Sequence, residues 1–333
     1  DFDSALPLFD LTVRERPDNP MAHYFKALCL LKKGENRLAR EDLVKAVELD
    51  PNFLDARLLL AEYYLWEKNN ELARQQIDEA LRLDPNSIKA LMLNGNLNIV
   101  DKKLTEAEAD FMQVVEKAPN HAPAYTKLGL LYILMGKQEK ALENLEKALD
   151  LDPMQMNALA LAVNIHTKAG EHDKALQICN SLKTEIGQDT SSLAQILYIE
   201  GTVYLAKNDT TAASQRFEEA ISTDANIVAA YFSLAKRCIK ENRIEQAISH
   251  YKALVNEEPQ SLTGHMGLGT LYDQKGDFQK AEASYRKALE IKHNFAPAAN
   301  NLAWLLMKNG GNIDEALGFA PVSYTHLTLP TNI

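Results

Sequence analysis

Several residue types that would point to a particular class of protein are scarce in this sequence. Its 333 residues include only 14 glycines and 12 prolines, which argues against a strand-rich fold with many tight turns. Three cysteines, Cys29, Cys179 and Cys238, lie far apart and form no CxxC pair. They indicate neither a disulfide framework nor a zinc site. No run of 18 apolar residues is present, so we expect no direct insertion into a membrane.

Positive charge is also in short supply. The chain has 36 lysines and arginines against 46 acidic residues, a formal net charge of -10, and no basic tract. A nucleic-acid partner is therefore not expected on electrostatic grounds. Hydrophobic residues make up 46% and charged residues 25%, which is typical of a folded chain rather than a disordered or fibrous one.

A period of 34 residues runs through the chain. Prolines occur at Pro17, Pro51, Pro85, Pro119 and Pro153, each 34 residues after the last. An alanine stands twelve residues before each proline slot, and this alanine continues where the proline is replaced. Between residues 39 and 281 the fixed alanines are Ala39, Ala73, Ala107, Ala141, Ala175, Ala213, Ala247 and Ala281. One repeat carries four extra residues, which we place in a longer connection at 183–193.

The apolar spacing within one period is helical. Leu58, Ala61 and Leu65 recur at steps of three and four, and after a polar turn Ala73 and Ile77 do the same. Each period therefore predicts two helices joined by a short turn. The proline ends the second helix because it lacks an N–H and clashes with the preceding turn.

A small residue recurs in each first helix and predicts close helix packing. The glycines in this slot are Gly95, Gly129, Gly201 and Gly269. A helix pair approaches closely only where both faces lack bulk, so we expect this slot to face the fixed alanine of the second helix.

These residues resemble the tetratricopeptide repeat. The resemblance rests on the small slot, the fixed alanine, the terminal proline and two aromatic slots, which hold Tyr64, Tyr132, Tyr204 and Tyr272 in the first helix and Phe111, Phe217, Tyr251 and Tyr285 in the second. Val163 departs from the small slot, and Ala225 and His293 depart from the proline slot. The resemblance implies an all-α fold, a right-handed α-solenoid of about nine repeats.

The repeat pattern divides the chain as follows. We expect residues 1–19 to be the second helix of a truncated repeat, 20–295 to be eight repeats, and 296–320 to be a truncated ninth repeat. The tail 321–333, PVSYTHLTLPTNI, has no helical period. It resembles a peptide found at the ends of unrelated translated sequences, so we expect it to be disordered or artefactual. No polar capping helix is seen at either end, which predicts that both ends are truncated.

No catalytic or metal-binding pattern emerges. Gly264, Gly267 and Gly269 lie in a predicted helix with no strand before them, so the phosphate-loop interpretation fails. The eight histidines are dispersed, and the carboxylates alternate with lysines as on a solvated helix face. We therefore expect no enzymatic activity, no metal and no cofactor.

The resemblance implies that first helices line a concave groove in which peptides bind. First-helix positions that point away from the second helix are apolar early in the chain and amide-rich later. The groove residues we select are Tyr24, Leu28, Leu58, Glu62, Trp66, Met92, Asn96, Ile99, Leu130 and Asn164. Trp66 and Tyr24 are the strongest candidates for aromatic anchors.

The sequence thus favours a non-catalytic scaffold or adaptor that binds a protein segment, either a peptide or a helix, in this groove. Three alternatives stay open, and one of them is a sensor whose superhelix changes pitch when a small ligand or peptide binds. The array could be the targeting or regulatory part of a larger enzyme such as a glycosyltransferase, although only Asn300–Ala303 resembles the asparagine ladder of such arrays. It could also be an envelope or exopolysaccharide assembly factor, because the segment 300–320 is similar to bacterial repeat proteins of that kind. Cytoplasm and periplasm are equally compatible with the sequence, and so is any oligomeric state.

Overall fold

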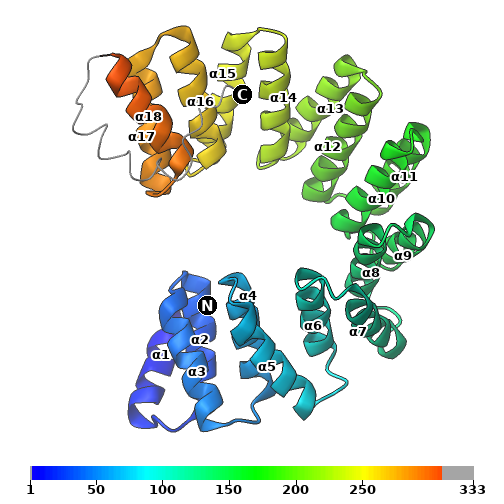
Figure 1. Ribbon diagram of the computed structural model, residues 1–333, viewed down its shortest axis with the longest axis vertical. Coiled ribbons are helices and arrows are strands. Elements are labelled where there is room, and N and C mark those ends of the chain that lie inside the picture. The colour runs from blue at the N-terminus through cyan, green and yellow to red at the C-terminus, as the bar shows by residue number, and fades with distance from the viewer. Residues whose placement is uncertain (1, 310–333) are drawn as a thin grey trace. The chain divides into compact units, whose positions relative to one another are not determined.

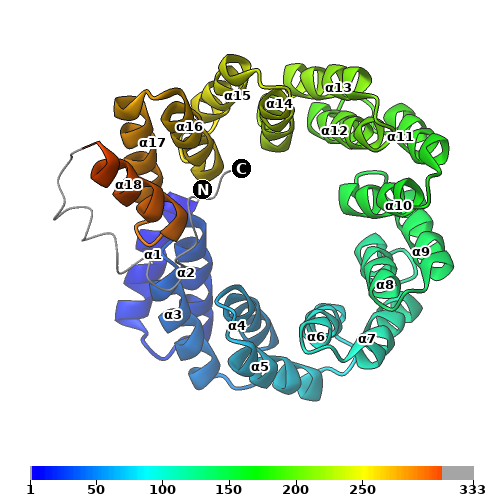
Figure 2. The ribbon, with the colours of Figure 1, turned by 45° about the horizontal axis from the view of Figure 1, so that its top comes forward.

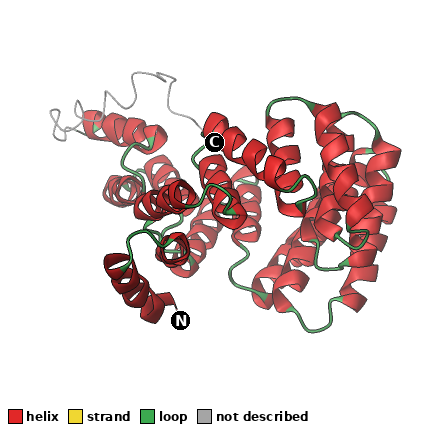
Figure 3. Cartoon of the chain, turned by 90° about the horizontal axis from the view of Figure 1, so that it is seen from below, coloured by secondary structure: helices red, strands yellow, loops and turns green. Residues whose placement is uncertain are grey.

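The computed structural model describes residues 2–309, and this part of the chain is built of helices without a strand (Figures 1 and 3). The helices alternate between two kinds, as the 34-residue period predicts. The first helices are α2 (Pro20–Lys33), α4 (Leu54–Trp66), α6 (Ile88–Val100), α8 (Ala122–Leu134), α10 (Met156–Lys168), α12 (Thr190–Ala206), α14 (Val228–Lys240), α16 (Leu262–Lys275) and α18 (Ala296–Lys308). The second helices are α1 (Phe2–Glu15), α3 (Asn36–Leu49), α5 (Asn70–Leu83), α7 (Leu104–Lys117), α9 (Gln138–Leu151), α11 (His172–Glu185), α13 (Thr210–Thr223), α15 (Ile244–Glu257) and α17 (Phe278–Ile291).

The chain forms two compact units, residues 1–165 and 166–333. In the first unit, α4, α6 and α8 form one layer and α5, α7 and α9 form the other (Figure 2), and α4 contacts α6 directly. The second unit repeats this arrangement, with α12, α14 and α16 in one layer and α13, α15 and α17 in the other. From α1 to α9 and from α11 to α18, consecutive helices pack against each other, which is the helix-pair packing of a repeat solenoid.

The fixed alanines of the second helices are fully buried from Ala39 to Ala281. The glycines of the first helices make their tightest contact with a different residue of the second helix. A Cβ atom on Gly95 would lie 2.5 Å from Cε1 of Phe111, and one on Gly201 would lie 2.4 Å from Cε1 of Phe217. Each glycine therefore faces the side chain one turn after the fixed alanine, where a bulky residue fills the space that the glycine leaves. The expected approach of glycine to the fixed alanine is present at Gly129, where a Cβ atom would lie 3.4 Å from the Ala141 carbonyl oxygen, but the tightest contact of each glycine is one helical turn further along.

Every first helix from α2 to α16, including the longer α12, is followed by a turn that contains one residue in the left-handed conformation. The residues in this slot are Gly34, Lys68, Lys102, Gly136, Gly170, Asn208, Asn242 and Gly276, with φ between 58° and 79°. The left-handed conformation lets the turn return its N–H groups to the helix: the N–H of Gly34 donates to the Leu31 carbonyl at 3.1 Å. Glycine adopts this conformation without strain, whereas a Cβ atom makes it costly.

Replacing Lys68 and Lys102 by glycine is expected to stabilise the protein. The left-handed strain on a residue with a Cβ is about 1–2 kcal/mol, and the flexibility of glycine in the unfolded chain offsets about 0.5–1 kcal/mol of the gain. A net gain of about 0.5–1 kcal/mol for each substitution should appear in urea unfolding curves. Gly136→Lys is the matched reverse change, and it should lower the free energy of unfolding by a similar amount. A stability loss in Lys68→Gly would contradict the strain argument.

The predicted long connection at 183–193 is wrong. Helix α11 ends at Glu185 and α12 begins at Thr190, so only residues 186–189 connect them. The extra residues lengthen α12 to 17 residues, against 13 in α14. The Asp189 carboxylate caps this extension by accepting from the N–H of Ser192 at 2.8 Å. Residues added to a helix form backbone hydrogen bonds within that helix. In a loop of the same length, these backbone groups would have to bind water instead.

The predictions for the chain end fall mostly outside the described residues. The tail 321–333 and most of the second helix expected within 296–320 lie beyond residue 309. The predicted repeat boundaries from 1–19 to 296–320 remain an interpretation of the 34-residue period. Within residues 2–309, no helix has both the length and the hydropathy that crossing a bilayer requires.

Candidate functional site

An apolar surface accompanies the first helices of the first unit. Its partly exposed side chains stand at corresponding positions of α2, α4, α6 and α8 and are Leu28, Leu31, Leu65, Met92, Ile99, Leu130 and Ile133. We call this set the apolar first-helix face. Burying such side chains against a partner removes apolar area from water, which is the main driving force for association.

The most exposed apolar residues of these helices are each the last residue of a helix. Trp66, Val100 and Leu134 end α4, α6 and α8, and their exposed fractions are 65%, 60% and 52%. We call these three residues the apolar row. They are 34 residues apart, so each occupies the same place in its repeat. Trp66 was predicted from the sequence. Val100 and Leu134 were missed, although aligning the repeats on Trp66 would have found them.

The two predicted aromatic anchors differ in accessibility. Trp66 is exposed, and its indole lies 5.9 Å from the ring of Tyr63 between centroids. Tyr24 is half-buried between Phe25 and Phe53, at centroid distances of 5.3 and 5.0 Å. Burial raises the pKa of the Tyr24 hydroxyl, and nearby carboxylates add to that shift. The Trp66 side chain is therefore accessible from solvent, whereas the Tyr24 ring packs against two neighbouring aromatic rings.

The other predicted groove residues are spread over several environments. Leu58 is only 2% exposed and belongs to the core, so it is not available to a partner. The prediction of Leu58 as a groove residue is wrong, because neighbouring helices cover its side chain. Glu62 is paired with Lys89, with Oε2 and Nζ 3.0 Å apart. Asn96 is partly exposed and Asn164 is exposed.

A polar cluster that the sequence analysis missed ties α5, α6 and α7 together. Arg74 donates to the side chains of Asn94, Asn98 and Asp101 at 2.6, 3.0 and 2.7 Å. Both asparagines in turn donate to the carboxylate of Asp110 at 2.8–3.1 Å. Burial raises the pKa of Asp110, and the two asparagine amides act in the opposite direction. These groups satisfy one another, as a structural cluster requires.

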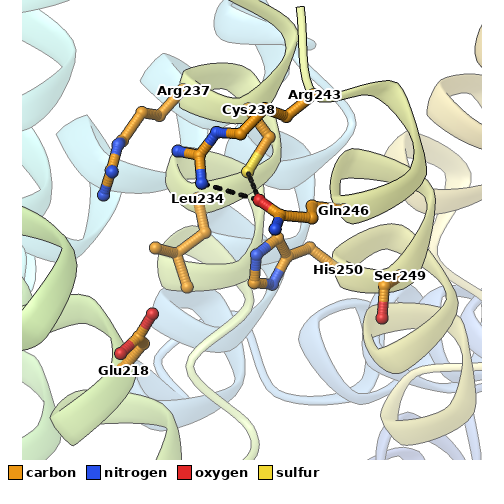
Figure 4. Close-up of a pocket in the computed structure, with 8 residues that line it drawn as sticks. All are labelled: Glu218, Leu234, Arg237, Cys238, Arg243, Gln246, Ser249 and His250. Atoms are coloured by element: carbon orange, nitrogen blue, oxygen red, sulfur yellow. Dashed lines mark hydrogen bonds between the residues drawn. The ribbon is translucent and has the colours of Figure 1, made fainter. Parts of the chain in front are cut away.

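A cleft of about 340 Å³ lies in the second unit, among α13, α14 and α15 (Figure 4). Eight residues line it: Glu218, Leu234, Arg237, Cys238, Arg243, Gln246, Ser249 and His250. The Arg243 Nη1 group donates to Gln246 Oε1 at 2.6 Å, and Cys238 Sγ lies 3.9 Å from the same oxygen. No sequence pattern indicates this cleft, because its residues come from three helices and follow no motif spacing.

The described residues show neither a metal-binding cluster nor a reactive thiol. No group of three or more histidine, cysteine or acidic side chains within them is arranged to hold a metal ion. Cys29, Cys179 and Cys238 are buried free thiols, and burial raises the pKa of each, in the case of Cys179 to about 12. A thiol with a raised pKa stays protonated at neutral pH, which makes it a poor nucleophile.

The comparisons with known proteins agree with this architecture. Models of the tetratricopeptide repeat match residues 1–42, 31–97, 122–154 and 263–295. The chain is 29% identical over 169 residues to the mouse (Mus musculus) protein described as "Superkiller complex protein 3", and the match spans about a tenth of the length of that relative.

Solved structures with a similar fold include those of PilF and PilW. The structure titled "Functional Characterization of Pseudomonas Aeruginosa pilF" is 23% identical, covers 63% of this chain and 94% of its own, and has a TM-score of 0.50. The PilW structure, titled as a type IV pilus biogenesis factor, is 20% identical, covers 61% of this chain and 92% of its own, and has a TM-score of 0.52. At these identities the likeness concerns the fold.

Paired helices, a fixed buried alanine and an exposed apolar face define a helical-repeat protein of the interaction-scaffold class. The chain is a tetratricopeptide repeat protein.

Proposed function

We propose that the first unit binds an apolar segment of another protein on the apolar first-helix face and the apolar row, and that it does so without catalysis. The observation that carries this proposal is the exposure of Trp66, Val100 and Leu134 at one position of three consecutive repeats. Scattered exposed apolar residues need no explanation, whereas a periodic set beside an apolar face is typical of an interaction site.

The limits of the apolar row also support a defined site. Lys32 and Lys168 occupy the same position in the flanking repeats, so the row is confined to three helices. A segment of two to three helical turns, or an extended peptide, presents apolar residues at comparable intervals. Trp66 is the expected anchor, because a large aromatic side chain buries much area at little conformational cost. The net charge of -10 disfavours a nucleic acid as the partner.

Selection from a displayed peptide library tests this function. The full chain is expected to enrich peptides with apolar residues at helical or alternating spacing. Their affinity should fall at least about tenfold in the triple variant Trp66→Lys, Val100→Lys, Leu134→Lys, since three contacts become charged and unpaired.

The matched control places lysine at three exposed apolar residues of second helices in the same unit. Leu8, Leu38 and Met112 serve this purpose, and the triple control should bind the selected peptides as the unaltered chain does. Circular dichroism should show equal helix content in both variants. Equal binding by the two triple variants, or loss in the control alone, would show that the apolar row is not the site.

A further inference from the structure

We propose that the cleft among α13, α14 and α15 binds a phosphoryl dianion, either as free phosphate or carried by an organic group such as a phosphorylated side chain. The cleft lies within residues 218–250, and the proposed peptide site lies within residues 28–134. The two proposals therefore rest on different residues and can fail separately.

The cleft is rich in hydrogen-bond donors that are not fully used by neighbouring residues. Arg237 uses its Nε–H on Glu241 Oε1 at 2.9 Å, which leaves its terminal N–H groups for a ligand. The Gln246 oxygen accepts from Arg243, so the amide nitrogen of that side chain is left to donate. Neither the Ser249 hydroxyl nor the His250 ring has a hydrogen-bond partner among the residues described.

The two arginines of the cleft, Arg237 and Arg243, also place positive charge beside it. Both Arg237 and Arg243 pair with the single carboxylate of Glu241, which lies outside the lining of the cleft. Burial lowers the pKa of His250, Glu218 counteracts that shift, and the two arginines lower the pKa further. The same two arginines lower the pKa of the Cys238 thiol against the effect of burial. Positive charge thus acts on groups inside the cleft and not only on the outer surface.

The arrangement and volume of the cleft suit the shape of a phosphoryl group. A phosphoryl group carries two negative charges and three oxygens that accept hydrogen bonds from several directions, and arginine forks match this geometry. In Figure 4 the guanidinium groups of Arg237 and Arg243 lie on the same side of the cleft, above Leu234, while the His250 ring lies below Gln246. A volume of about 340 Å³ exceeds that of phosphate itself, so an organic portion can enter with it.

The carboxylate of Glu218, which lines the cleft, is expected to repel a bound anion, and removing its charge tests the proposal. Glu218 is the acidic side chain among the eight lining residues, so Glu218→Gln removes a repulsive charge. This variant is expected to bind phosphate about three- to tenfold more tightly, as expected for a charge a few ångströms away near a protein surface. A damaged fold cannot produce a gain of this kind, which separates the effect from misfolding.

The experiment titrates the full chain, in a buffer without phosphate, with inorganic phosphate and with O-phosphoserine. The histidine ring signals are followed by nuclear magnetic resonance, and His250 is assigned with the variant His250→Gln. Both ligands are expected to shift the His250 signals saturably. Arg237→Gln and Arg243→Gln should each weaken binding about tenfold or more, because each removes a charge-assisted donor. Lys252→Gln is the matched control, since Lys252 is exposed on α15 outside the cleft.

Comparing O-phosphoserine with inorganic phosphate shows whether the cleft binds an organic phosphate or free phosphate. Tighter binding of O-phosphoserine than of phosphate assigns the site to a phosphorylated side chain or a similar organic ligand, and equal binding assigns it to free phosphate. The proposal is overturned if His250 does not respond saturably up to about 10 mM ligand, a weak limit of specific binding. It is equally overturned if Lys252→Gln weakens binding as much as Arg237→Gln, or if the dicarboxylate glutarate binds as tightly as phosphate.

Discussion

Replacing Phe111 by alanine is expected to lower the free energy of unfolding by about 3–5 kcal/mol, the usual loss for a fully buried phenylalanine. Phe111 is fully buried on α7, and its ring occupies the space in front of Gly95, where a Cβ atom would lie 2.5 Å away. Gly95, which faces the ring from α6, has no side chain with which to fill the resulting cavity. Urea unfolding followed by circular dichroism, together with hydrogen exchange of the α6 and α7 amides, measures the loss.

The glycine side of the same contact supplies an internal check. Gly95→Ala should cost about 1–3 kcal/mol by overpacking, and adding Phe111→Leu should recover part of that loss, because the smaller side chain makes room for the new methyl group. Such non-additivity is expected only for residues in direct contact. Met112, the exposed neighbour on α7, is the control, and Met112→Ala should change stability by no more than about 0.5 kcal/mol. Strict additivity of the Gly95 and Phe111 changes would contradict the contact.

Alkaline pH is expected to destabilise the second unit through Tyr251. This side chain is 1% exposed, packs where a Cβ on Gly267 would lie, and has its pKa raised to about 12 by burial. The unfolded value is near 10. Since the folded pKa is the higher one, the contribution of Tyr251 to stability is complete below pH ~10 and is lost as the pH rises through ~12.

The variant Tyr251→Phe isolates this effect. At pH ~11.5 it should retain about 2 kcal/mol of stability that the unaltered chain loses relative to pH ~8, which follows from the two pKa values. At pH ~8 the two proteins should differ little, because the Tyr251 hydroxyl has no hydrogen-bond partner among the described residues. Tyr125→Phe, a change at a partly exposed tyrosine, serves as the control. Equal alkaline losses in Tyr251→Phe and in the unaltered chain would contradict the burial of the hydroxyl.

The regular parts of the fold could be predicted because each depends on neighbouring residues in sequence. The fixed alanines from Ala39 to Ala281 are buried as expected, since their helix periodicity and the terminal proline are both local signals. The tightest contact of each glycine lies one turn beyond the fixed alanine expected there, because the period identifies which residues pack but not how far two helices slide along each other. The four extra residues before Leu193 gave no local sign that they would extend α12 rather than form a loop.

The candidate sites were predictable only in part. Trp66 stood out from the sequence because a large aromatic residue at an outward position is unusual, whereas Val100 and Leu134 in the same slot are residues common in any core. Leu58 was selected for its outward position and proved to be covered by neighbouring helices. Burial depends on which side chains the adjacent repeat contributes, and one repeat considered alone does not contain that information.

By itself, the sequence determined the helix pairs, their period and the family, because helix formation and helix ends are governed by residues within a few positions of one another. The tertiary structure decided which outward residues remain exposed and which side chains meet across helices. The cleft is the clearest case, since Glu218, Arg237 and His250 come from three helices and share no sequence motif. They line one cavity only because consecutive helices pack side by side.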